Sequence, residues 1–195
     1  MNQIKNVCVY SASSTKIAPV YFAVAEELGQ LLALRGINLI NGAGSIGLMA
    51  ATSNACLAAG GTVTGVIPRF MVEQGWQHKS LTQLIETETM HERKQIMAEM
   101  SDGVIALPGG CGTMEELLEI ITWKQLGIYL NPIIILNING LSRFSKYLLP
   151  ATWYTAVCGQ PMRAVSNVAV PELTIAACAL SSRVYVSLVS SSPCK

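Results

Sequence analysis

Short apolar runs alternate along the chain with longer stretches in which apolar residues recur at helical spacing. The apolar runs predict strands at residues 6–11, 37–40, 62–67, 84–88, 103–107 and 133–137. The helically spaced stretches predict helices at residues 20–34, 48–59, 90–100 and 114–125. Strands that alternate with helices through short connections form a parallel sheet with helices on both faces. We therefore predict a single doubly wound, Rossmann-like α/β domain.

The composition narrows the possible functions. The 195 residues are 51% hydrophobic, enough for a substantial core, and the formal net charge of +1 provides no basic field for nucleic acid. Residues 1–5 lack the order of a signal peptide, and charges interrupt each apolar run before about 18 residues. The six cysteines include no C-x-x-C pair, so we expect reduced thiols and no metal site. We expect a cytoplasmic protein that binds neither nucleic acid nor membrane.

The last 55 residues differ in character from the rest. Residues 141–195 hold five of the 13 Lys and Arg residues but one of the 12 Asp and Glu residues, and they lack a sustained helical period. We therefore divide the chain into a nucleotide-binding α/β domain at 1–140 and an atypical C-terminal segment of the same domain at 141–195. Within this segment, residues 182–191 alternate as a strand does and are apolar enough to pair with another chain.

The clearest chemical signal lies in the loop after the fifth predicted strand, which reads P-G-G-C-G-T over 108–113. Ligands of doubly wound sheets bind outside the carboxyl ends of the strands. Free backbone N–H groups and the helix dipole favour an anion where a helix begins. The loop matches neither the Walker motif nor G-x-G-x-x-G, so it predicts a phosphate site without naming a cofactor. A tight glycine turn with no ligand is the alternative interpretation.

A carboxylate opens the helix after this loop. Glu116 shares a helical stripe with Ile120 and Trp123, which predicts surroundings of low dielectric constant near the phosphate loop. There it could act as a general base or stabilise positive charge on a sugar. A capping box with Thr113 is the alternative interpretation.

Two adjacent cations open the preceding helix. Arg93 and Lys94 point about 100 degrees apart, so one can reach the site while the other faces elsewhere. Arg93 suits bidentate recognition of a phosphate or carboxylate, and ordinary solvated charges are the alternative. Glu73 lies in a polar connection that the pattern does not assign.

Together these segments resemble the LOG family, the cytokinin riboside 5′-monophosphate phosphoribohydrolases long named lysine decarboxylases. The motif P-G-G-x-G-T-x-x-E is complete over 108–116, and M-H-E-R-K at 90–94 looks like the family's second motif. Three shorter motifs follow the family's order and spacing: G-L-M at 47–49, V-I-P at 66–68 and I-T-W at 121–123. The resemblance covers roughly residues 6–140.

This resemblance implies hydrolysis of the N-glycosidic bond of a purine nucleoside 5′-monophosphate to free base and ribose 5-phosphate, without metal or cofactor. It implies a homodimer or higher homo-oligomer. Carried over by motif, the catalytic residues are Arg93 and Glu116. The substrate-binding residues carried over are Glu73, Lys94, Gly109, Gly110, Cys111, Gly112, Thr113, Glu115 and Thr122. Lysine decarboxylation is disfavoured because no lysine stands out as a Schiff-base partner for pyridoxal phosphate.

The chain departs from the family pattern in two respects. Ala12, Ala43 and Ala50 stand where glycines are usual, and residues 141–195 do not resemble the family's next helix. We hypothesise that this tail is a replaced C-terminus, with a frame shift as one origin. A non-catalytic nucleotide-binding or carrier protein of the same fold is the alternative function, and a remnant inactivated by the tail is a third. The sequence does not decide which base is released.

Overall fold

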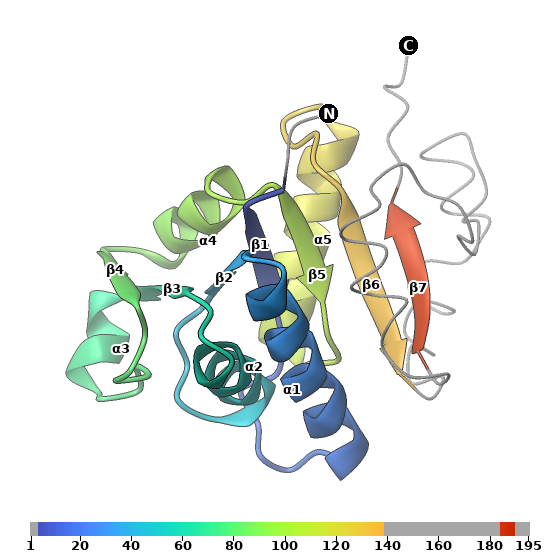
Figure 1. The fold of residues 1–195 in the computed structure, drawn as a ribbon. Coiled ribbons are helices and arrows are strands. Elements are labelled where there is room, and N and C mark those ends of the chain that lie inside the picture. Colours follow the sequence, from blue (N-terminus) through green and yellow to red (C-terminus); the bar gives the residue numbers. More distant parts are fainter. Residues whose placement is uncertain (1–3, 139–183, 190–195) are drawn as a thin grey trace.

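A seven-stranded sheet forms the centre of the computed structural model, which describes residues 4–138 and 184–189 (Figure 1). The sheet order is β4-β3-β2-β1-β5-β6-β7. The strands are β1 (Asn6–Tyr10), β2 (Asn38–Asn41), β3 (Val63–Pro68), β4 (Gln83–Thr87), β5 (Gly103–Ala106), β6 (Ile133–Ile138) and β7 (Val184–Val189). The helices are α1 (Pro19–Leu34), α2 (Gly47–Ala58), α3 (Arg69–Glu73), α4 (Met90–Glu99) and α5 (Cys111–Gln125). The first six strands are parallel, which confirms the predicted α/β fold.

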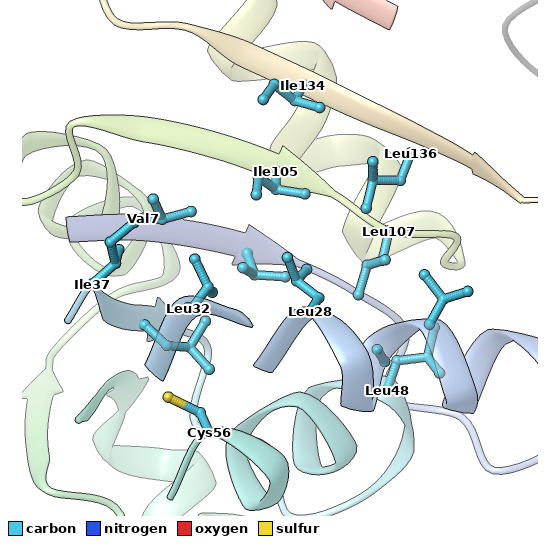
Figure 2. Packing of buried hydrophobic residues seen from close by; sticks show 14 of the residues in the cluster. Val7, Leu28, Leu32, Ile37, Leu48, Cys56, Ile105, Leu107, Ile134 and Leu136 are labelled. Atoms are coloured by element: carbon cyan, nitrogen blue, oxygen red, sulfur yellow. The ribbon is translucent and has the colours of Figure 1, made fainter. Parts of the chain in front are cut away.

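Helices cover both faces of the sheet because its central strands are apolar on both faces. Along β1, Val7 and Val9 join one buried cluster, while Cys8 and Tyr10 join the other. The first cluster receives its side chains from α1 and α2, and the second from α4 and α5. Figure 2 shows the first cluster, in which side chains of α1 and α2 meet those of β1, β5 and β6. This two-faced burial explains why the strands read as continuous apolar runs.

The order of strands reverses beside β1, which pairs with β2 on one side and with β5 on the other. The loops after these strands therefore meet at one edge of the sheet. The N–H of Ala12 donates to the Pro108 carbonyl at 3.3 Å, and the N–H of Leu48 donates to the Ala12 carbonyl at 2.9 Å. The fold thus brings together the loops that follow β1, β2 and β5.

Apart from shifts of one residue at element ends, the elements differ from the expected ones in two places. The five-residue helix α3 was not predicted, because it lies in a short connection without helical periodicity. Helix α5 begins at Cys111, three residues before the expected start, so part of the glycine loop is its first turn. None of the helices among the described residues is long and apolar enough to cross a membrane.

The strand-like pattern at 182–191 is confirmed as β7, and its partner lies in the same chain. β7 pairs antiparallel with β6 over its whole length, from Ile133↔Val189 to Ile138↔Val184. β7 is an edge strand of the sheet, so the expectation that this segment can pair with another chain stays a prediction. Residues 139–183 and 190–195 lie outside the described residues, so the division at residue 140 and the replaced-tail hypothesis stay predictions.

Candidate functional site

Arg93 and Glu116 form an ion pair between α4 and α5. The Nη1 atom of Arg93 lies 3.1 Å from Oε1 of Glu116, and each side chain is 7% exposed. Arg93 Nε also donates to the Val66 carbonyl at 3.1 Å, near the carboxyl end of β3. The guanidinium therefore connects the end of the sheet to the carboxylate on α5. These are the two residues that the family resemblance assigns to catalysis.

The start of α4 fixes which of its side chains face inward. Thr89 is the N-cap, and its side chain accepts a hydrogen bond from the Glu92 N–H at 3.1 Å. The Glu92 carboxylate in turn accepts from the Glu88 N–H at 2.8 Å, which completes a local cap. With the helix started there, Arg93 and Met97, four residues apart, are both buried. The cap thus sets the helical phase that directs Arg93 toward the sheet.

Glu116 is a buried carboxylate with opposing influences on its charge. Burial raises its pKa above the ordinary value, while the Arg93 guanidinium lowers it, and the outcome is a raised pKa. The predicted capping box with Thr113 is not formed, because the N-cap of α5 is Gly110 and Thr113 lies inside the helix. A buried carboxylate of raised pKa beside a cation is suited to proton transfer and to stabilising positive charge.

The glycine loop leads directly into α5. Gly110 is the N-cap and supplies no side-chain cap, so the first-turn N–H groups are available to an anion. Gly109, Cys111 and Gly112 are exposed, whereas Thr113 is 6% exposed. A Cβ atom at Gly109 would overlap Thr113 Oγ1 and lie 2.7 Å from its Cγ2, so glycine there lets Thr113 pack beneath the loop. The loop therefore leaves the start of α5 exposed, and phosphate binding there stays a prediction.

Lys94 faces a different set of partners from Arg93, in keeping with the 100-degree separation. Its Nζ pairs with Glu115 and lies 2.9 Å from Oε2 of Glu119, both on α5. Burial opposes the charge of Lys94, but its hydrogen bonds to Glu115 and Glu119 outweigh burial and raise its pKa. Two carboxylates thus neutralise this lysine and hold α4 to α5 beside the Arg93–Glu116 pair.

Two predicted contacts lie apart from this pair. Thr122 is exposed, and its hydroxyl donates to the Leu118 carbonyl of its own helix at 2.8 Å. At 1.5 Å per residue it lies about 9 Å along α5 from Glu116. Glu73 is exposed at the end of α3. Their role as substrate contacts stays a prediction.

The turn after β2 carries one of the family departures. Ala43 adopts a φ of 58°, in the left-handed region that favours glycine. Its N–H donates to Asn41 Oδ1 at 2.9 Å, and its carbonyl accepts from the His78 N–H at 2.8 Å. Asn41 is held in turn by Ser53 Oγ at 2.8 Å. These bonds hold the alanine in a conformation that costs it about 1 kcal/mol or more.

Some features of the site were missed by the sequence analysis. Cys8 lies close to Glu116, and burial and then this carboxylate raise the thiol's pKa. Ser11, 3% exposed at the end of β1, has a buried hydroxyl with no hydrogen-bond partner among the described residues. The Val66 carbonyl that binds Arg93 has no sequence signal, because every residue carries a carbonyl. For Ser11 the signal was its place directly after a buried strand.

Comparison with known proteins identifies the family. The family model described as "Possible lysine decarboxylase" matches residues 49–158. Cytokinin riboside 5′-monophosphate phosphoribohydrolase LOG5 of Arabidopsis thaliana is 45% identical over 148 residues, which are 76% of this chain and 64% of that protein. The probable phosphoribohydrolase LOG6 of the same plant is 43% identical over 71% of this chain and 69% of its own length. The rice relative LOG (Oryza sativa subsp. japonica) is 44% identical over 71% of this chain and 57% of its own length.

Solved structures share the fold more distantly. A molybdenum cofactor binding protein from Rippkaea orientalis has a TM-score of 0.61 and 26% identity, covering 75% of this chain and 85% of that one. The molybdenum cofactor carrier protein of Chlamydomonas reinhardtii has a TM-score of 0.56 and 24% identity, over 67% and 76% of the two chains, which shows likeness of fold alone. On the family model and the plant relatives together, this chain belongs to the LOG family.

Proposed function

We propose that this protein hydrolyses the N-glycosidic bond of a purine nucleoside 5′-monophosphate, releasing the free base and ribose 5-phosphate. The observation that carries the proposal is the buried Arg93–Glu116 pair, which joins α4 to α5. A glycine-rich helix start with no side-chain cap lies about two turns or less from Glu116 on the same helix. The names of the curated relatives LOG5 and LOG describe this reaction, which supports the proposal.

In this proposal the loop at 109–113 holds the 5′-phosphate. The first-turn N–H groups of α5 donate to the phosphate oxygens, and the helix dipole favours their charge. Such a contact positions the ribose without taking part in bond breaking. Held at one end of α5, the nucleotide presents its glycosidic bond to a carboxylate on the next turn.

Glu116 acts at the reacting carbon. Loss of the base leaves positive charge on the sugar, which resembles an oxocarbenium ion, and a fixed carboxylate stabilises that charge. The C1′–N bond breaks with its electron pair going to the base, a water oxygen bonds to C1′, and Glu116 takes a proton from that water. The departing base takes up one proton from solvent and Glu116 releases the proton it accepted, so the carboxylate is restored and the products are free base and ribose 5-phosphate. Arg93 lowers the pKa of Glu116 against the larger effect of burial and orients the carboxylate, so both residues are required.

The remaining candidates line the nucleotide. Glu115 and Lys94 lie one residue from the catalytic pair on their helices and fix the spacing between α4 and α5. Glu73, Cys111 and Thr122 are exposed and free to contact the substrate at its periphery. The side chains of Glu73, Cys111 and Thr122 form no hydrogen bond or ion pair with the catalytic pair. Substitution of any of these three residues is therefore expected to change KM more than kcat.

The protein is also proposed to form a homodimer or larger homo-oligomer. Leu126, Ile128 and Leu130, in the loop after α5, are 68%, 67% and 72% exposed. Large apolar side chains gathered on one exposed segment favour a protein interface. Light scattering of wild type and of Leu126→Ser with Ile128→Ser tests this, and a wild-type monomer at micromolar concentration would oppose it.

A non-catalytic nucleotide-binding or carrier protein is the second candidate function. The likeness to the molybdenum cofactor binding protein of Rippkaea orientalis favours it. A carrier needs the phosphate loop, whereas a hydrolase also needs Arg93 and Glu116 directed at one ribose. The buried pair therefore favours the hydrolase.

The two functions are separated by product analysis. Purified protein is incubated with adenosine monophosphate (AMP) or N6-isopentenyladenosine monophosphate, and free base is measured by chromatography. Binding of AMP is measured in parallel by calorimetry. Base release supports the hydrolase, and binding without base release supports the carrier.

A further inference from the structure

The Arg93 guanidinium packs directly against the backbone of Gly42. A Cβ atom built at Gly42 would overlap Nη2 of Arg93 and lie 2.9 Å from its Cζ. Non-bonded carbon atoms pack at roughly 3.5–4.0 Å, so a side chain at residue 42 excludes the present position of the guanidinium. The absence of a side chain at this residue is a condition for the observed Arg93–Glu116 geometry.

Gly42 is placed to support Arg93 by the register of the sheet. β2 ends at Asn41, which pairs with Gly65 of β3, so Gly42 and Val66 are the next residues along these two strands. Arg93 Nε donates to the Val66 carbonyl at 3.1 Å. The guanidinium therefore lies between the end of β2 and the Val66 carbonyl of β3, and it directs Nη1 toward Glu116 on α5.

Conformation does not require glycine at residue 42. Gly42 is absent from the glycines with positive φ, whereas its neighbour Ala43 has a φ of 58°. This turn thus carries an alanine where the backbone favours glycine, and a glycine where the backbone accepts any residue. Glycine is required at residue 42 because a side chain there would occupy the space that the Arg93 guanidinium fills.

We propose that Gly42 is a positioning residue whose missing side chain seats the Arg93 guanidinium against Glu116. The structural half of the proposal concerns packing alone, and its link to catalysis rests on the proposed function. An added methyl group at residue 42 would displace the guanidinium from both the Val66 carbonyl and the carboxylate. Glu116 would then remain buried without its nearest cation.

Displacement of Arg93 is expected to change the pKa of Glu116. Arg93 lowers the pKa of Glu116, so its removal lets the pKa rise further. The other titratable groups near Glu116 are Glu115 and Lys94 beside it and Cys8 and Tyr10 on β1. Burial raises the pKa of both β1 groups, so they stay neutral, and Lys94 is already paired with two carboxylates. Lys94 also lowers the pKa of Glu116, but its own ion pairs are with Glu115 and Glu119, so it does not replace a displaced Arg93.

A double-mutant cycle on thermal stability tests the packing, whatever the function. Gly42→Ala in the wild type is expected to lower Tm by about 4 °C or more, as overpacking of a buried site does. In the Arg93→Ala background the obstructing guanidinium is gone, and the same substitution should lower Tm by less than about half as much. Equal losses in the two backgrounds would overturn the seating of Arg93 on Gly42.

Kinetics test the catalytic link. Gly42→Ala should lower kcat on the order of 10²-fold, with a smaller change in KM, and move the acidic limb of the pH profile upward. Gly60→Ala is the control, since Gly60 has a φ of +78° and no atom within 4 Å of its built Cβ. This control should lose stability but keep kcat and the pH limb. A normal pH limb and kcat in Gly42→Ala would overturn the positioning role.

The two arms also separate this inference from the proposed function. If wild type releases no base but the stability cycle shows coupling, the proposed function fails and the seat on Gly42 stands. If wild type is active and the cycle shows no coupling, the positioning role of Gly42 is refuted and the proposed function stands.

Discussion

Arg93 Nη1 lies 3.1 Å from Oε1 of Glu116, and both side chains are almost fully removed from solvent. A buried ion pair of this kind contributes little net stability compared with apolar residues, but losing one partner leaves an unpaired buried charge. Such a costly arrangement at the end of a sheet, beside an uncapped glycine helix start, is characteristic of a functional site. The predictions below separate its contribution to stability from its contribution to chemistry.

Removing the cation should destabilise the protein in a pH-dependent way. Arg93→Met is expected to cost about 3 kcal/mol of unfolding free energy at pH 7, because Glu116 is left buried without its cation. The folded-state pKa of Glu116 is raised, so this group favours folding at low pH, and that contribution is lost as pH rises through the raised value. The cost should therefore shrink toward pH 5. Urea unfolding of wild type and Arg93→Met at pH 5 and pH 7 measures this loss of unfolding free energy.

A matched double variant controls this prediction. Arg93→Met with Glu116→Gln removes both charges, so it should recover part of the stability and lose most of the pH dependence. A cost for Arg93→Met that is the same at pH 5 and pH 7 would argue against an unpaired Glu116 charge.

The cap of α5 predicts opposite changes in stability and nucleotide binding. Gly110 is the N-cap, in an extended conformation with nothing within 4 Å of its built Cβ. Gly110→Asp should cap the helix and add a few tenths of a kcal/mol, while its charge repels the phosphate and weakens AMP binding more than about tenfold. Thermal unfolding and calorimetry measure the two effects.

Gly110→Asn is the control, because asparagine caps comparably and carries no charge. It should weaken AMP binding less than Gly110→Asp does. Equal binding by wild type and Gly110→Asp would place the phosphate elsewhere.

The exposed thiol in the loop offers a chemical probe. Cys111 is exposed in the first turn of α5, whereas Cys8 and Cys56 are buried. Alkylation with N-ethylmaleimide should add bulk at the phosphate position and lower activity more than tenfold, and bound AMP should slow the inactivation. Cys111→Ser should be active and resist the reagent. Inactivation of Cys111→Ser at the wild-type rate would assign the effect to another cysteine.

The fold could be predicted from the sequence because each strand and helix of a doubly wound sheet has a hydrophobic pattern that is visible in a short stretch of the chain. Each buried strand and each amphipathic helix is readable by itself, and their alternation sets the parallel topology. The earlier start of α5, by contrast, does not have a local cause. Cys111 and Gly112 have poor helix propensity, and they are helical because the preceding strand and the sheet place them there.

The site could be predicted only in part. The phosphate loop and the Glu116 helix follow from position after a strand, whereas the pairing of Arg93 with Glu116 depends on how α4 and α5 pack. Sequence spacing gave the angle between Arg93 and Lys94 but not their partners. The support from Gly42 depends on an overlap between two segments far apart in the sequence, which only three-dimensional packing reveals.

Base release by wild type and Glu116→Gln, run side by side on AMP and N6-isopentenyladenosine monophosphate, tests the central claim most directly. Glutamine keeps the size of Glu116 and removes its charge and its capacity as a base. We expect wild type to release free base and Glu116→Gln to lose about 10²- to 10⁴-fold of the rate while still binding AMP. A Glu116→Gln variant that keeps more than about a tenth of the wild-type rate would contradict the role of this carboxylate, since a placed base contributes at least about 10²-fold.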